Sequence, residues 1–164
     1  MKIAVIYSTL IEDTKKSAQI LKDLINEEVV LISIENAKDI CLLKYNIIIL
    51  GASTYNNKVQ GSFKRYISRN IKTLLERPYA LYVNSDENLD IDTNLNKVFA
   101  REIIESSILY SNFGYNINTD IGNFIERRKS KKIIENSEKI PSLNKYKIEE
   151  FAKIINELIE KRVG

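Results

Sequence analysis

Short apolar segments alternate with amphipathic segments along this chain, and the alternation limits the folds that it can adopt. Runs rich in β-branched residues predict five strands, at 2–7, 29–34, 46–50, 79–83 and 115–119. Apolar residues at helical spacing predict four helices, at 14–26, 63–75, 93–108 and 145–162. Strands that are apolar on both sides and that alternate with helices are typical of a parallel sheet with helices on both faces. We therefore expect an α/β sandwich.

The length of the chain suits one domain. Its 164 residues, of which 44% are hydrophobic, can bury a sizeable core, and we expect a single domain over residues 1–164. No apolar stretch approaches the roughly 20 residues that span a bilayer, and the first residues lack the pattern of a signal peptide. The sequence thus predicts a cytoplasmic protein without stable membrane insertion.

The residue types that are missing restrict the chemistry. The chain contains no histidine, which is the commonest general base and metal ligand, so we expect neither a metal site nor a catalytic side chain. Its one cysteine, Cys41, follows a pattern typical of a half-buried helical turn and is interpreted as a small core residue. Any chemistry is therefore expected to come from a cofactor.

Charge gives one local signal. The net charge of only +3 does not favour nucleic acid as a partner. A basic cluster nevertheless lies within six positions, without aromatic residues between its members: Arg127, Arg128, Lys129, Lys131 and Lys132. Without base-stacking side chains this cluster is not typical of a nucleic-acid surface, and a solvated helix face remains an alternative to a binding role.

The end of the first predicted strand is a candidate phosphate site. Hydroxyl residues Ser8 and Thr9 follow the strand directly, and Thr14 lies where a helix begins. A helix N-terminus offers unpaired N–H groups and a partial positive charge to an anion. Asp13 or Thr14 could instead simply cap the helix. In a parallel sheet, ligands bind beyond the carboxyl ends of the strands, so the segments 8–14, 52–61 and 84–90 are the candidate site.

Six stretches, spread over nearly the whole chain, together resemble the sequences of a known protein family. They are YST with Thr14 downstream, IIILGASTYNNKVQGSFKRYI, LYVNS, FAREII, NINTDIG at the end of the expected fifth strand, and EEFAKIINELI. This set resembles the flavodoxin-like superfamily, in particular the branch of flavodoxin-domain proteins that includes the menaquinone-dependent protoporphyrinogen dehydrogenases. The resemblance implies a three-layer sandwich with strand order 2-1-3-4-5.

The resemblance also implies FMN as the cofactor. Its phosphate would lie at Ser8, Thr9 and Thr14, and its ring between two loops. The first loop comprises Ala52, Ser53, Thr54, Tyr55, Asn56 and Asn57, and the second begins with Asn84, Ser85 and Asp86. Tyr55 could stack on the flavin, and Asn56 and Asn57 stand where relatives carry glycine or aromatic residues. The flavin N5 atom would carry the reaction.

The phosphate loop departs from the family pattern. Where related enzymes have a glycine, this chain has Glu12, followed by Asp13. Two carboxylates beside a phosphate would repel it unless they point into solvent. A fold that has lost its cofactor and serves only as a binding protein is therefore one alternative.

Two redox functions compete with that alternative. The first is an FMN-dependent oxidoreductase acting on a tetrapyrrole, either oxidising a porphyrinogen or reducing or degrading haem. Arg127, Arg128 and Lys131 would then pair with the tetrapyrrole carboxylates, and a reductase or an acceptor would exchange electrons with the flavin. The second is a small flavodoxin-type electron carrier, although the positive net charge differs from the acidic surface that we expect of such a carrier.

Overall fold

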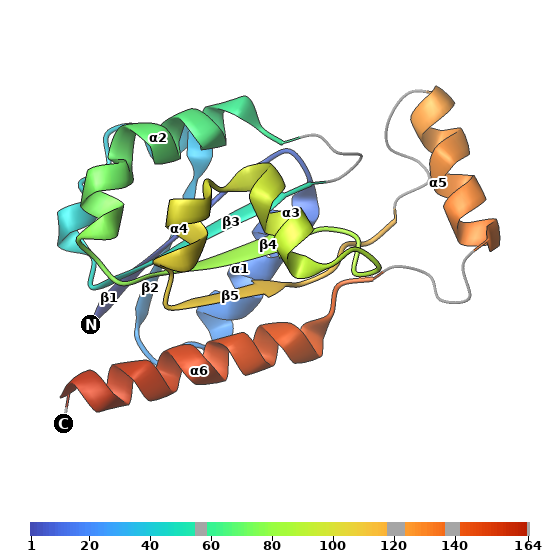
Figure 1. Ribbon diagram of the computed structural model, residues 1–164. Coiled ribbons are helices and arrows are strands. Elements are labelled where there is room, and N and C mark those ends of the chain that lie inside the picture. Colours follow the sequence, from blue (N-terminus) through green and yellow to red (C-terminus); the bar gives the residue numbers. More distant parts are fainter. Residues whose placement is uncertain (55–58, 118–123, 137–141, 164) are drawn as a thin grey trace.

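Five parallel strands form the centre of the molecule (Figure 1). The structure is a computed structural model, and it describes residues 1–54, 59–117, 124–136 and 142–163. The strands are β1 (Lys2–Tyr7), β2 (Glu28–Ser33), β3 (Ile47–Ser53), β4 (Tyr79–Asn84) and β5 (Leu109–Asn112). Their order in the sheet is β2-β1-β3-β4-β5, as the family resemblance implies. The predicted flavodoxin-like α/β fold is confirmed.

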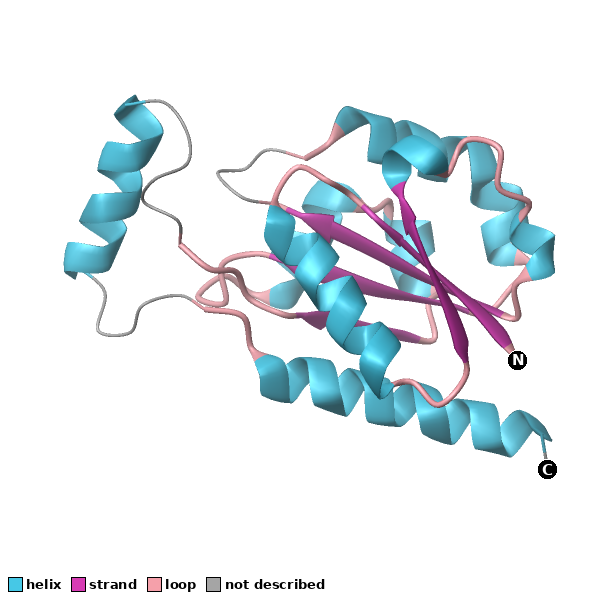
Figure 2. Ribbon diagram, turned by 180° about the vertical axis from the view of Figure 1, so that it is seen from behind, coloured by secondary structure: helices cyan, strands magenta, loops and turns pink. Residues whose placement is uncertain are grey.

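Helices cover both faces of the sheet (Figures 1 and 2). One face carries α2 (Gly61–Leu75), α3 (Ile91–Val98), α4 (Arg101–Glu105) and the short 3-10 turns Ile34–Asn36 and Leu42–Lys44, and the other carries α1 (Glu12–Leu24) and α6 (Lys145–Val163). Both views show α5 (Phe124–Asn136) outside these layers, on the side where the strands end. In the described part of the chain, no helix is both long and apolar enough to cross a membrane.

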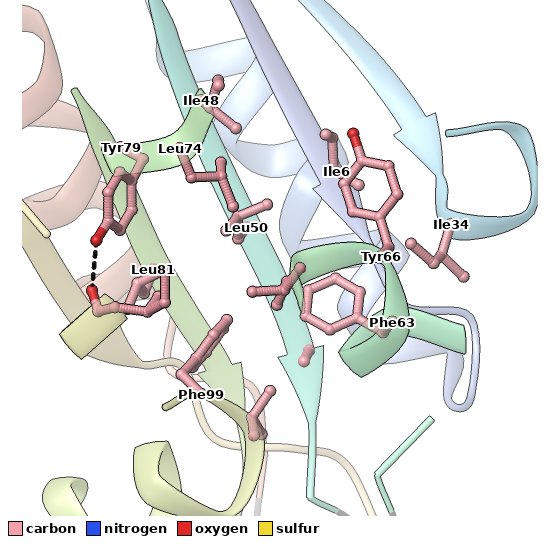
Figure 3. Close-up of a cluster of buried hydrophobic side chains, with 14 of the residues drawn as sticks. Ile6, Ile34, Ile48, Leu50, Phe63, Tyr66, Leu74, Tyr79, Leu81 and Phe99 are labelled. Carbon is pink, nitrogen blue, oxygen red and sulfur yellow. Dashed lines mark hydrogen bonds between the residues drawn. The ribbon is translucent and has the colours of Figure 1, made fainter. Parts of the chain in front are cut away.

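The core under α2, α3 and α4 is built on aromatic and aliphatic side chains from several elements (Figure 3). Phe63 of α2 meets Phe99 edge to face, with ring centroids 6.1 Å apart. Tyr79 at the start of β4 donates a 2.8 Å hydrogen bond to the carbonyl oxygen of Ile103 in α4. A buried tyrosine hydroxyl needs such a partner, and this bond fixes α4 against the sheet.

The opposite core contains a column of three aromatic rings. Tyr82 of β4 stacks on Phe113 with centroids 4.9 Å apart, and Phe113 meets Phe151 of α6 edge to face at 5.3 Å. Tyr82 also crosses the neighbouring strand β3 at Gly51, with which it is paired in the sheet. A Cβ atom built on Gly51 would lie 1.9 Å from the Tyr82 ring, so only glycine leaves room for this crossing.

Two expected elements differ from the observed ones. The fifth strand is Leu109–Asn112, which pairs with β4. Of the expected strand 115–119, residues 115–117 are not in a strand, and residues 118 and 119 lie outside the described residues. The edge strand β5 is only partly buried, so its apolar signal is weak. The helix expected over 93–108 is divided into α3 and α4, because Phe99 and Ala100 are extended. The break buries the Phe99 side chain against Phe63, a tertiary contact that helical periodicity does not reveal.

The interpretation of Cys41 as a core residue is wrong. Cys41 is exposed and immediately precedes the 3-10 turn Leu42–Lys44, in an extended conformation. The neighbouring Leu42, which is 3% exposed, occupies the core position instead. The local pattern correctly indicated a buried side chain at this turn, but that side chain is Leu42 and not Cys41.

We expect Gly51→Ala to destabilise the protein by about 3 kcal/mol or more, because the added methyl group must displace the Tyr82 ring from a close-packed core. Urea unfolding would measure this loss. Gly61→Ala is a matched control, since its nearest neighbour would be the Arg65 guanidinium at 3.9 Å, and it should be neutral or slightly stabilising. In the double variant with Tyr82→Leu, the loss should be smaller than the sum of the single losses. Strict additivity would contradict the proposed clash.

Candidate functional site

The segment between β1 and α1 leaves the sheet at the edge where ligands of parallel sheets bind. The N–H of Ser8 donates to the carbonyl oxygen of Gly51 at 2.8 Å, which continues the pairing of β1 and β3 beyond the end of β1. The N-cap of α1 is Ile11, whose apolar side chain caps nothing. Capping by Asp13 or Thr14, the alternative considered from the sequence, is therefore excluded. The free N–H groups of the first helical turn face the loop side.

Buried hydroxyl groups without partners gather around this segment. Six buried side-chain oxygen atoms lack a hydrogen-bond partner within the described residues, and four of them follow or end β1, β3 and β4 or lie in the first turn of α1. These four are the hydroxyl oxygens of Ser8, Thr14, Ser53 and Ser85. Native proteins pair nearly all buried polar groups, so such a concentration at one end of a sheet is the signature of a site for a polar ligand.

The start of α1 is held in place by Tyr82. Its hydroxyl donates a 2.8 Å hydrogen bond to the carbonyl oxygen of Thr14 after crossing β3 at Gly51. Burial raises the pKa of Tyr82 well above its ordinary value, so the hydroxyl stays protonated and remains a donor. The bond connects β4 to the helix start and thereby fixes where the Thr14 hydroxyl lies. Sequence reasoning did not identify Tyr82 as a site residue, because its role depends on Gly51.

The two carboxylates of the first helical turn point in different directions. Glu12 is exposed. Asp13 is buried and accepts two hydrogen bonds of 2.7 Å, from the backbone N–H and from the side-chain amide of Asn116. Asp13 thus ties the segment after β5 to the start of α1. Its charge is met by these two donors, which reduces the repulsion that the sequence suggested.

A third carboxylate, Glu35, lies at the same loop and was missed from the sequence. The Thr9 hydroxyl donates to it. Gln60 completes a small network: its carbonyl oxygen accepts from the Thr9 N–H at 2.7 Å, and its amide donates to the Thr9 hydroxyl at 3.1 Å and to Glu35 at 3.0 Å. Glu35 follows the end of β2, and β2 lies beside β1, so the strand order could have predicted its proximity.

Glu35 is ionised in this network. The Thr9 hydroxyl is the main cause that holds the pKa of Glu35 below its usual value, and Gln60 contributes in the same direction. Burial raises the pKa of the neighbouring Tyr7, and the charge of Glu35 raises it further. At neutral pH the network therefore carries a fixed negative charge beside the predicted phosphate loop.

The predicted ring-binding segment after β3 is described only in part. Ala52, Ser53 and Thr54 are buried at the end of the strand, and the Thr54 N–H donates to the carbonyl oxygen of Asn84 at 3.2 Å. This bond joins the ends of β3 and β4. The remaining predicted residues, Tyr55, Asn56 and Asn57, lie outside the described residues.

The segment after β4 is shaped by amide side chains. The Asn84 amide donates to the Ser17 hydroxyl at 3.0 Å and to the carbonyl oxygen of Gly114 at 2.8 Å, so it braces α1 rather than facing outward. Asn112 accepts from the Ser85 N–H at 3.3 Å. Asn88 donates to the Asp86 carboxylate at 2.9 Å through both its backbone and its side chain.

Gly114 allows the chain after β5 to approach this segment. It has a positive φ of 65°, and a Cβ atom there would meet the backbone oxygen of Ser142 at 2.6 Å. The neighbouring Glu87 pairs with Lys147 of α6 at 2.8 Å and accepts from the side-chain amide of Asn144 at 3.0 Å. Glycine is favoured where the backbone is left-handed and closely packed, so the segment after β4 and the start of α6 are fixed together.

The predicted substrate residues lie on a separate element. Arg127, Arg128 and Lys131 are exposed on α5, together with Lys129 and Lys132. Both ribbon views show α5 on the side of the sheet where β1, β3 and β4 end. Ser130, in the same helix, is buried, so the basic residues form the outward part of the helix. We refer to these five exposed residues as the α5 basic surface.

Comparison with known proteins agrees with the observed fold. The sequence profile of a family described as a flavodoxin domain matches residues 4–144. No curated protein sequence matches the chain.

Similar solved structures are flavodoxins. One is oxidised flavodoxin 2 from Bacillus cereus, which is 17% identical with a TM-score of 0.52 over 84% of this chain and 100% of that chain. Another is a flavodoxin from the domain Archaea, 17% identical with a TM-score of 0.50 over 93% and 99% of the two chains. A third is a short-chain flavodoxin associated with a non-canonical PDU bacterial microcompartment, 14% identical with a TM-score of 0.54 over 82% and 95%. At identities this low, the likeness shows a shared fold and no more than that.

Replacing Asp13 by alanine should destabilise the protein by about 2 kcal/mol, because two hydrogen bonds to a buried carboxylate are lost. Glu12→Ala is the matched control: it removes the same charge from the same helical turn but from an exposed side chain, and should change stability by less than about 0.5 kcal/mol. Urea unfolding measures both values, and amide exchange at Asn116 should accelerate only in Asp13→Ala. Equal effects of the two substitutions would show that the contact with Asn116 contributes nothing.

Proposed function

The chain belongs to the flavodoxin-domain family, and from this premise we propose that it binds FMN at the carboxyl ends of β1, β3 and β4 and transfers electrons through the flavin. The observation that carries this proposal is the group of buried, unpartnered hydroxyls of Ser8, Thr14, Ser53 and Ser85 among the described residues. Flavodoxin-like sheets with this strand order bind FMN where the winding reverses, between β1 and β3.

The phosphate would be held by the loop between β1 and α1. Ser8 and Thr14 supply buried hydroxyl donors, and the uncapped first turn of α1 supplies N–H groups. The Thr9 hydroxyl donates to Glu35 and would have to change partner to join them. A helix N-terminus with several donors binds an anion without a basic side chain. The residues present therefore fit a phosphate group.

The flavin ring would be held by the segments after β3 and β4, namely Ala52 to Asn57 and Asn84 to Asp86. Bound FMN supplies hydride or single-electron transfer, which the chain itself cannot perform with its own side chains. The protein would orient the ring and limit nearby charge. Two features support the latter role: Glu87 is neutralised by Lys147, and Asp86 is engaged by Asn88.

Substitution of Thr14 by valine tests the phosphate site. Valine keeps the shape and removes the hydroxyl, so FMN affinity should fall by a factor of about 10 to 100, the range for one lost hydrogen bond to a charged group. Quenching of flavin fluorescence on titration of the apoprotein measures the dissociation constant. Ser68→Ala, which removes an exposed hydroxyl on α2 bonded to the Lys64 carbonyl oxygen, should leave the affinity unchanged. No quenching by the unaltered protein at micromolar concentrations would contradict the proposal.

A second candidate function is an FMN-dependent oxidoreductase that acts on a tetrapyrrole, like the protoporphyrinogen dehydrogenases that the sequence resembles. The α5 basic surface favours it, because exposed cations on the side of the sheet where FMN would bind can pair with propionate groups. The donor or acceptor that exchanges electrons with the flavin would be a separate protein or small molecule. The same basic surface could equally meet an acidic redox partner.

Charge reversal on α5 separates these two functions. In Arg128→Glu/Lys131→Glu, FMN affinity should stay unchanged because these residues lie on a separate exposed helix. For a tetrapyrrole enzyme, binding of protoporphyrin or haem should weaken at least tenfold, which absorbance titration of the FMN-loaded protein would measure. Lys161→Glu on α6 is the control for net charge. If the unaltered protein binds neither tetrapyrrole, the carrier function remains.

A further inference from the structure

We propose that Glu35 sets the phosphate selectivity of the flavin site in two ways. It engages the Thr9 hydroxyl, which a phosphate could otherwise use, and it places a negative charge beside the phosphate loop. This inference rests on the FMN-binding function proposed above. It goes further by predicting that the chain distinguishes FMN only weakly from riboflavin, the same flavin without its phosphate.

The first argument is that the donors of Thr9 are already in use. The Thr9 N–H donates to the side-chain carbonyl oxygen of Gln60 at 2.7 Å, and the Thr9 hydroxyl donates to the Glu35 carboxylate. The Gln60 amide donates to both partners, at 3.1 Å to the Thr9 hydroxyl and at 3.0 Å to Glu35. A phosphate oxygen can use Thr9 only by replacing these bonds. The three side chains therefore form a closed network that competes with the phosphate.

The second argument is electrostatic. Glu35 is ionised at neutral pH, and the hydrogen bond from the Thr9 hydroxyl lowers its pKa further. No basic side chain of the described residues takes part in the hydrogen bonds of this network. A phosphate dianion would therefore meet a negative charge to which no basic side chain of the described residues donates a hydrogen bond. Glu12 is exposed, as Glu35 is, but Glu35 is held at the loop by hydrogen bonds from the Thr9 hydroxyl and the Gln60 amide. Asp13 is engaged by Asn116.

A neutral ligand end is treated differently by the same network. The terminal hydroxyl of the riboflavin side chain is a donor, and a carboxylate accepts such a bond readily. Glu35 therefore penalises the phosphate of FMN without penalising riboflavin. The remaining donors, the hydroxyls of Ser8 and Thr14, still favour the phosphate. The balance of these opposing contributions gives weak selectivity.

The test compares FMN and riboflavin in Glu35→Gln. Glutamine keeps an oxygen acceptor for Thr9 and removes the charge, so FMN affinity should rise about tenfold, as expected for a dianion near one surface charge, with riboflavin affinity unchanged. Fluorescence quenching and calorimetry measure both dissociation constants. The gain in FMN affinity should shrink at high salt. Gln60→Glu, which adds a charge to the same network, should act in the opposite direction.

Glu28→Gln is the matched control, because it removes one carboxylate from the opposite end of β2, where Glu28 pairs with Lys2 at 3.0 Å. It should leave both affinities unchanged. The inference is overturned if the unaltered protein binds FMN and Glu35→Gln binds it equally or less tightly, which would make Glu35 a brace for the loop. If no variant binds either flavin, the FMN-binding function itself fails, and this outcome is distinct from the first.

Discussion

The hydrogen bond from the Tyr82 hydroxyl to the carbonyl oxygen of Thr14 is the contact on which the candidate site depends most directly. It is possible only because Gly51 leaves the space that the tyrosine ring crosses. The same ring stacks on Phe113, which in turn meets Phe151 of α6. One aromatic column therefore connects β4, the segment after β5, α6 and the start of α1. The hydrophobic core thereby positions the start of α1, where the Thr14 hydroxyl lies.

Three carboxylates lie near the start of α1, and the fold treats each differently. Glu12 is exposed, Asp13 is satisfied by Asn116, and Glu35 is bound to Thr9. The two charges that seemed unfavourable from the sequence, those of Glu12 and Asp13, are therefore not equivalent. Glu35 comes from the 3-10 turn after β2 and is held against Thr9 in the segment between β1 and α1. Affinity for an anion depends on such placement more than on the number of charges.

Much of the fold and part of the site could be predicted from the sequence. The strands that are buried on both faces, such as β3, have continuous apolar runs that leave little ambiguity. The edge strand β5 was misplaced because half-buried positions carry a weak signal, and the break between α3 and α4 was missed because Phe99 pairs with Phe63, which is distant in sequence. Ser8, Thr14, Ser53 and Ser85 lie in segments that the sequence singled out by their positions at strand ends and at a helix start. Glu35 was missed because the end of β2 was not among the candidate segments, and Gln60 lies in the candidate segment 52–61 but was not singled out.

The sequence by itself determined the fold class, the strand order through its family resemblance, and which loops gather at the carboxyl edge of the sheet. The fold class and the meeting of these loops follow from local periodicity and from the geometry of parallel strands, whereas the strand order rests on the resemblance. Tertiary structure alone decided the roles of individual polar groups: Asn84 braces α1, Asp13 binds Asn116, and Glu35 holds Thr9. Each of these contacts joins residues far apart in sequence, and a hydrogen bond requires positions accurate to a few tenths of an ångström. Only the packed core sets such positions.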